Sequence, residues 1–71
     1  MRMSYDPDAD AAYVYLVDEI GARGVDRTVP VDPSEVGGMI NLDFDAEGRL
    51  LGIEILDASR LLPPGLLPGS G

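Results

Sequence analysis

The side chains best placed for chemistry in this sequence are carboxylates on a predicted β-hairpin over residues 41–56. Strand alternation puts Asn41, Asp43 and Glu54 on one face of that hairpin. Two carboxylates can share general acid–base work when their surroundings separate their pKa values. The sequence indicates no nucleophile, oxyanion donor or pocket beside them, so we assign no catalytic residue. We instead predict a surface that binds a protein partner, with four candidate residues: Asn41, Asp43, Asp45 and Glu54.

Three aspartates near the N-terminus, Asp6, Asp8 and Asp10, have the spacing of a calcium-binding loop. Such a loop needs Gly at its sixth position and a bidentate Glu at its twelfth, because the chain must turn sharply and wrap the ion. Counted from Asp6, those positions hold Ala11 and Val17. We therefore predict a turn that the Asp6 carboxylate caps, and we assign no metal and no cofactor.

The amino-acid composition excludes further classes of function. The 71 residues contain neither Cys nor His, which removes thiolate and imidazole chemistry, and the net charge is −8 with Arg as the only basic residue. An acidic surface repels phosphate, so direct nucleic-acid binding is not expected, whereas a basic protein would be attracted. No apolar run approaches the roughly 20 residues of a membrane span, and no signal-peptide core is present. We expect a cytoplasmic protein that does not contact a membrane.

The hairpin is predicted from its alternation. Apolar residues recur at every second position around a turn at residues 47–48: Ile40, Leu42 and Phe44 before it, and Leu51, Ile53 and Ile55 after it. A two-residue loop there sets Phe44 opposite Leu51 and keeps the apolar side chains on one face, as a four-residue loop would too. A three-residue loop with a Gly bulge would mix the faces, so we favour the two-residue loop.

Three further strands are predicted over residues 2–5, 11–17 and 25–31, where short runs are apolar or alternate. The third should be an edge strand or irregular near its end, because Pro30 cannot donate to a ladder. The predicted fold class is mainly β (α+β). It consists of a single small antiparallel sheet of four to five strands in a meander, with a short C-terminal helix.

The C-terminal region changes pattern after the last strand. A short helix should begin after Asp57, which is a good N-cap residue, and end before Pro63. Residues 1–62 are predicted to form one β-rich domain. Residues 63–71 are predicted to form a Pro/Gly-rich tail that is partly disordered.

Nine alternating residues should be buried on one side of the sheet: Ala12, Val14, Leu16, Ile40, Leu42, Phe44, Leu51, Ile53 and Ile55. Tyr13, Tyr15 and Val17 lie on the other side of their strand, and one short helix cannot cover both sides. We therefore predict a homodimer with these three residues as candidate interface. Gly52 lies inside a strand, which predicts that Tyr13 or Tyr15 crosses over it.

Two stretches carry a family resemblance. Residues 5–14 read Tyr-Asp-Pro-Asp-Ala-Asp-Ala-Ala-Tyr-Val, and residues 43–59 follow Asp-x-Asp-x-x-Gly-x-x-x-Gly-Ile-Glu-Ile-Leu-x-Ala-Ser. They resemble the opening and the close of the YuzE-like family, small prokaryotic proteins of unknown function. The resemblance implies a small β-rich fold with a short C-terminal helix and carries over no catalytic residue. It also implies an antitoxin-like role, because family members are suspected of being partners of small toxin-like proteins.

These features together predict a small acidic protein-binding or regulatory module, an antitoxin-like partner of a basic protein that binds or cleaves RNA. Two alternatives stay open. The first is a small metal-binding or hydrolytic protein that uses the acidic hairpin face, and the second is a purely structural, self-assembling subunit. A basic partner that co-purifies would favour the binding module. A metal-dependent rise in melting temperature would favour the metal-binding or hydrolytic protein, and an oligomer without other ligands would favour the structural subunit.

Overall fold

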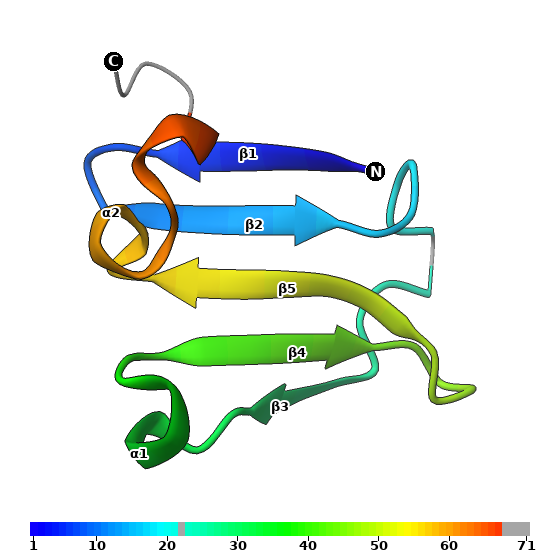
Figure 1. Ribbon diagram of the computed structural model, residues 1–71. Helices are drawn as coiled ribbons and strands as arrows, with labels where there is room; N and C mark the ends of the chain where they lie inside the picture. The colour runs from blue at the N-terminus through cyan, green and yellow to red at the C-terminus, as the bar shows by residue number, and fades with distance from the viewer. Residues whose placement is uncertain (22, 68–71) are drawn as a thin grey trace.

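The computed structural model describes residues 1–21 and 23–67, which fold around a five-stranded antiparallel sheet (Figure 1). In spatial order the strands are β1 (Arg2–Asp6), β2 (Ala11–Tyr15), β5 (Leu50–Leu56), β4 (Ile40–Phe44) and β3 (Arg27–Pro30). This architecture confirms the predicted fold class. Pro30 ends the edge strand β3, as predicted, because a residue without an N–H group is tolerated where no further strand pairs.

The strand order departs from a simple meander. β3, β4 and β5 follow one another in space as they do in sequence, but β2 lies next to β5 and not next to β3. The connection from β2 to β3 therefore passes the ends of β5 and β4 (Figure 1). Strands β2 to β5 form a Greek key, which makes β5 the central strand of the sheet.

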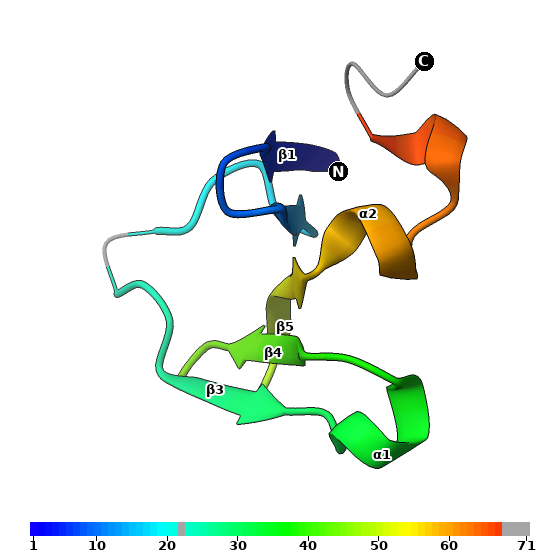
Figure 2. The ribbon, with the colours of Figure 1, turned by 90° about the vertical axis from the view of Figure 1, so that its left-hand side faces the viewer.

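Helical segments in the described part of the chain are short and lie on one side of the sheet (Figure 2). They are α1 (Pro33–Val36), α2 (Ala58–Leu61) and the 3-10 turn η1 (Pro64–Leu66). The Asp32 carboxylate accepts a hydrogen bond from the Ser34 amide and caps α1, which is a single turn. None of the described helices is long and apolar enough to cross a membrane.

Alternation along the strands separates an apolar face from a polar face. On the apolar face, one row of paired residues crosses all five strands: Met3, Val14, Ile53, Leu42 and Val29. The neighbouring row toward α2 holds Tyr5, Ala12, Ile55 and Ile40. α2 and the segment that follows it pack on this apolar face, because Ala58 of α2 and Leu67 join Ala12 and Ile55 in the core.

The core occupies only one end of the apolar face. Ala12 is 1% exposed, Ile55 5% and Ala58 0%. The predicted nine-residue core is therefore wrong for its other seven members, which are half-buried. Five of the seven pair on the predicted side of the sheet, namely Val14, Ile40, Leu42, Phe44 and Ile53. The helical segments, however, reach only the end near α2 (Figure 1).

Part of the predicted tail belongs to this core. Leu67 is 6% exposed and packs with Ala58, so the chain from 63 to 67 folds back over the sheet. Leu61 and Leu62 also pack against the core, whereas Leu66 is 52% exposed. Residues 68–71, the remainder of the predicted tail, lie outside the described residues, so the predicted partial disorder is not tested there.

The hairpin turn differs from the predicted two-residue loop. The Asp45 amide donates to the Arg49 carbonyl at 2.9 Å, which leaves residues 46–48 as a three-residue loop with Gly48 at φ 80°. The Asp45 carboxylate stabilises this loop by accepting from the amides of Glu47 and Arg49. A β-bulge then restores the register: Phe44 pairs with Leu50, Asp43 pairs with Gly52, and the extra residue between them has no partner.

Candidate functional site

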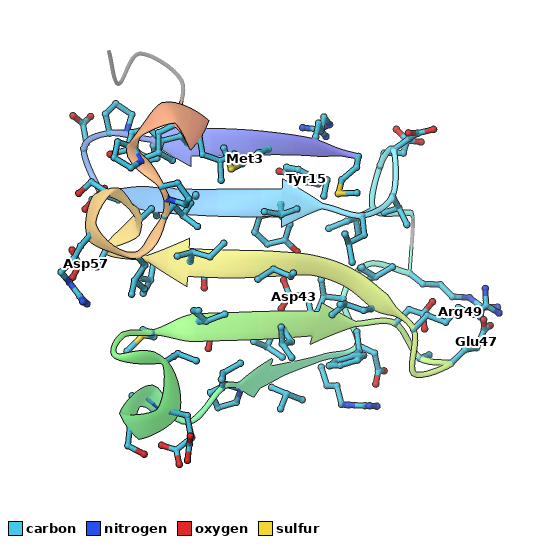
Figure 3. All side chains as sticks on the ribbon, viewed as in Figure 1. Met3, Tyr15, Asp43, Glu47, Arg49 and Asp57 are labelled. Atoms are coloured by element: carbon cyan, nitrogen blue, oxygen red, sulfur yellow. The ribbon has the colours of Figure 1, made fainter. Side chains whose placement is uncertain are left out.

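The candidate functional site is the polar face of the sheet, which carries two rows of polar side chains. One row holds Arg2, Tyr15, Gly52, Asp43 and Thr28, and the next holds Ser4, Tyr13, Glu54, Asn41 and Pro30. Asp43 and Tyr15 come from strands that are separated by β5 (Figure 3). The strand order, and not sequence proximity, therefore brings these residues together.

Asp43 accepts hydrogen bonds through both of its carboxylate oxygens. Its Oδ2 accepts a hydrogen bond from the Tyr13 hydroxyl at 2.6 Å, and its Oδ1 accepts one from the Thr28 hydroxyl at 2.6 Å. Burial and the hydrogen bond to Asp43 raise the pKa of the Tyr13 hydroxyl, so Tyr13 stays a proton donor. Both donors are neutral, so they fix the carboxylate in place without supplying a positive charge.

Gly52 makes the contact between Tyr13 and Asp43 possible. Tyr13 is paired with Glu54, yet its hydroxyl reaches β4 by crossing β5 over Gly52. A Cβ atom at this position would collide with Cε1 and the hydroxyl oxygen of Tyr13. The predicted crossing over Gly52 is thus confirmed, and Tyr13 is the residue that crosses.

Glu54 and Asn41 form the second polar pair of the site. They are direct neighbours on β5 and β4, and the Asn41 side-chain amide donates to Glu54 Oε1 at 2.9 Å. Salt bridges among the described residues involve Glu47 and Asp57, but neither Asp43 nor Glu54. The site therefore presents two half-buried carboxylates whose partners are all neutral.

An aromatic and cationic patch borders these carboxylates. The rings of Tyr13 and Tyr15 are 4.7 Å apart at a tilt of 56°, and the Arg2 guanidinium lies 3.8 Å from the centre of the Tyr15 ring. Of the candidate interface residues, Tyr13 and Tyr15 lie on the polar face, and the half-buried Val17 follows the end of β2. Sequence reasoning missed Arg2 and Thr28, which only the strand register identifies.

Asp45 does not join Asp43 and Glu54 in the way that the hairpin pattern predicts. Its Oδ1 is used by the turn, where it accepts from the Glu47 and Arg49 amides at 2.9 Å each. The hydrogen bond from the Arg49 amide lowers the pKa of the Asp45 carboxyl, and the Glu47 amide adds to this effect. Asp45 is thus a turn-forming residue, and the remaining predicted residues form the site.

A second cluster, which the sequence analysis missed, joins α2 to the β1–β2 turn. Asp10 Oδ1 accepts from the Tyr5 hydroxyl at 2.7 Å and from the Ser59 amide at 3.0 Å, and Oδ2 accepts from the Ser59 hydroxyl at 2.7 Å. These bonds lower the pKa of the Asp10 carboxyl, with the Tyr5 hydroxyl as the largest cause. We call Tyr5, Asp10 and Ser59 the helix clamp.

The helix clamp replaces the predicted cap of α2. Asp57 precedes the helix, but its side chain makes no cap hydrogen bond and instead accepts from Arg60 Nε at 2.6 Å. The carboxylate that binds the Ser59 amide comes from Asp10, which is 49 residues away in the sequence. The signal that could have found the clamp is the family-like pattern, since Tyr5, Asp10 and Ser59 all belong to its two stretches.

The predicted turn at Asp6 is confirmed. Its Oδ1 accepts from the Asp8 amide at 3.0 Å and from the Ala9 amide at 3.4 Å. Among residues 1–21 and 23–67, no three His, Cys, Asp or Glu side chains are close enough together to hold a metal ion.

Comparison with known proteins identifies the family. Residues 2–59 match the model of a protein family of unknown function, DUF2283, and the chain therefore belongs to that family. No curated protein and no solved structure matches the chain. The matched segment includes the whole polar face and the helix clamp, and it ends at Ser59.

Proposed function

We propose that this member of the DUF2283 family is an acidic protein-binding module, an antitoxin-like partner of a basic protein, and that it binds through the polar face of the sheet. One observation carries the proposal. Asp43 and Glu54 are held by neutral donors, from Tyr13, Thr28 and Asn41, and neither carboxylate forms a salt bridge with the described residues. Their negative charges are thus positioned but not neutralised.

Electrostatics supports a cationic partner. The chain carries a net charge of −8, which attracts a basic protein over a distance of about one Debye length, or roughly 8–10 Å at physiological salt. Once bound, a Lys or Arg of the partner would supply the missing counter-charge. The carboxylates are already oriented by their hydrogen bonds, so little side-chain entropy would be lost when they bind.

The neighbouring tyrosines fit the same role. Tyr13 and Tyr15 offer rigid aromatic area beside the two carboxylates, and Tyr side chains are enriched at protein interfaces. The antitoxin-like part of the proposal draws on the likeness to YuzE-like proteins in residues 5–14 and 43–59. The proposal places both partners in the cytoplasm, since a domain without Cys needs no oxidising compartment.

The test begins with the intact protein as bait in a pull-down from its native cell, followed by mass spectrometry. The basic protein recovered is then purified, and its association rate is measured with the parent and with the double variant Asp43→Asn/Glu54→Gln over a salt series. We expect the variant to associate more slowly, by on the order of tenfold at low salt, and the difference to shrink as salt rises.

A matched control variant separates the effect of the site from the effect of net charge. Asp8→Asn/Glu35→Gln removes the same two charges from exposed positions in the β1–β2 turn and in α1, away from the polar face. It should lower the association rate much less. Equal rates for the site variant and the control, or failure to recover any basic protein, would reduce the polar face to solvated surface.

A further inference from the structure

The half of the apolar face away from α2 is only partly covered by the described chain: Met3, Val14 and Ile53 touch the edge of the core, and none of its residues is fully buried. Its defining feature is a row of aliphatic side chains that are paired across all five strands and are half-buried or exposed: Met3, Val14, Ile53, Leu42 and Val29. Phe44 lies in the next row, farther from α2. We call these six residues the bare half. Val29, on the edge strand, is 39% exposed.

The bare half is only partly covered because the helical segments gather at the other end of the sheet. α1 and α2 both lie near the same ends of the strands (Figure 1). Leu61 of α2 fits against Gly38 so closely that a Cβ atom there would lie 2.6 Å from its Cδ1, and the Arg60 side chain donates to the Gly37 carbonyl at 2.8 Å. Together with the helix clamp, these contacts fix α2 at one end of the sheet.

Charge is distributed unequally between the two faces. The three carboxylates within the strands, Asp6, Asp43 and Glu54, all project from the polar face. The charged strand residue on the apolar face is Arg27, whose guanidinium lies 4.8 Å from the centre of the Phe44 ring. In a chain with a net charge of −8, the bare half is thus a surface without strand carboxylates.

We infer that a second copy of this chain covers the bare half, so that two sheets pack face to face as a symmetric dimer. A two-fold axis brings the same surface of each copy together, which places apolar residues against apolar residues here. A dimer through Tyr13, Tyr15 and Val17 would instead bring Asp43 and Glu54 toward the same carboxylates of the partner. Like charges in that arrangement repel each other, so the bare half is the surface on which an acidic chain can associate with itself.

The size of the exposed surface bears on how strongly two copies would associate. The chain exposes 4706 Å², against about 4,250 Å² for a compact monomer of its 7.5 kDa mass. Five strands about 4.8 Å apart make the row of aliphatic side chains in the bare half roughly 20 Å wide. Two such sheets packed face to face would lie about 10 Å from each other. A standard interface buries about 800 Å² per partner, so a surface of this width should give a weak dimer whose population depends on concentration.

The dimer leaves the polar face free, so it goes beyond the proposed function and does not depend on it. Sedimentation equilibrium of the intact chain between about 5 µM and about 1 mM measures the self-association constant. The average mass should rise from 7.5 kDa toward twice that value. Val29→Asp places a charge in the bare half at an exposed edge position, and it should weaken association at least about tenfold.

Two further variants make the outcome specific. Ser4→Asp adds the same charge to an exposed position of the other edge strand, on the polar face, and should leave association nearly unchanged. Val29→Lys lowers the net negative charge, yet it should still weaken association because its ammonium must lose water in an apolar interface. Circular dichroism of each dilute variant checks that the sheet is intact.

Three results would overturn the inference. The first is a parent mass that stays at 7.5 kDa at every concentration. The second is a dimer that survives both Val29 substitutions in folded protein. The third is a dimer that Ser4→Asp weakens as much as Val29→Asp does, which would put the interface on the polar face.

Discussion

The two halves of the apolar face are built from the same strands and from similar residues, yet they are buried to very different extents. Next to α2, Ala12 and Ile55 are 1% and 5% exposed. One row farther along the same strands, Val14 and Ile53 are only half-buried. Strand alternation thus decides which face a side chain takes, whereas burial depends on what lies above it.

The difference arises from how α2 is attached. The helix clamp bonds its first turn to the β1–β2 turn, and Leu61 and Arg60 contact the chain at Gly37 and Gly38. Both attachments lie at the same end of the sheet (Figure 1). A helix of one turn that is held there cannot reach the bare half.

The largest expected effect on stability comes from truncating one side chain at each end of the apolar face. Ile55→Ala should lower the free energy of unfolding by about 2–5 kcal/mol, because it leaves a cavity under α2. Phe44→Ala should lower it by only about 1–2 kcal/mol, since its ring already contacts solvent and Arg27. Urea titration at about 5 µM, a low concentration chosen to limit self-association, compares the two variants. Equal losses would contradict a one-ended core.

Gly52→Ala tests the polar face of the sheet, which is opposite the bare half. The new Cβ must displace the Tyr13 ring and its hydrogen bond to Asp43, which should cost about 1–3 kcal/mol. Gly21→Ala is the control, because a Cβ atom there meets nothing within 4 Å. In the background of Tyr13→Ala, Gly52→Ala should lose most of its effect. An unchanged cost in that background would mean that Tyr13 is not what Gly52 accommodates.

The smallest expected effect is the pH dependence of the helix clamp. The pKa of Asp10 is lowered in the folded chain, so its contribution is fully present above its ordinary value of 3.8 and is lost as pH falls through the lower folded pKa. Asp10→Asn removes this contribution. The melting temperature of the parent should therefore exceed that of the variant near pH 7, and the gap should narrow toward about pH 2.

Two checks make the pH experiment specific to the covered end. Asp8→Asn removes a charge from the same turn without touching α2. Its melting temperature should differ from that of the parent by less than the melting temperature of Asp10→Asn does. Hydrogen exchange at the Ser59 amide should speed up in Asp10→Asn, whereas exchange in the bare half should not. A gap that is independent of pH, or exchange that rises equally everywhere, would show that the clamp does not hold α2.

Much of this protein is determined by its sequence alone. Period-two alternation places Leu42 and Ile53 on one face and Asp43 and Glu54 on the other, because successive side chains of a strand point to opposite sides. Pro30 marks an edge strand, and Gly52 marks a close approach. Each of these inferences rests on the geometry of a few neighbouring residues, so no knowledge of distant contacts is needed.

Other features were decided by the tertiary structure. The three-residue loop keeps the two faces apart only because β5 holds one extra, unpaired residue, and the alternation by itself favours a loop without such a residue. The Tyr13–Asp43 bond requires β5 to lie between β2 and β4. The cap of α2 comes from Asp10, 49 residues from Ser59. Contacts between residues so far apart depend on which strands pair and where a helix docks, and local pattern carries no information on either.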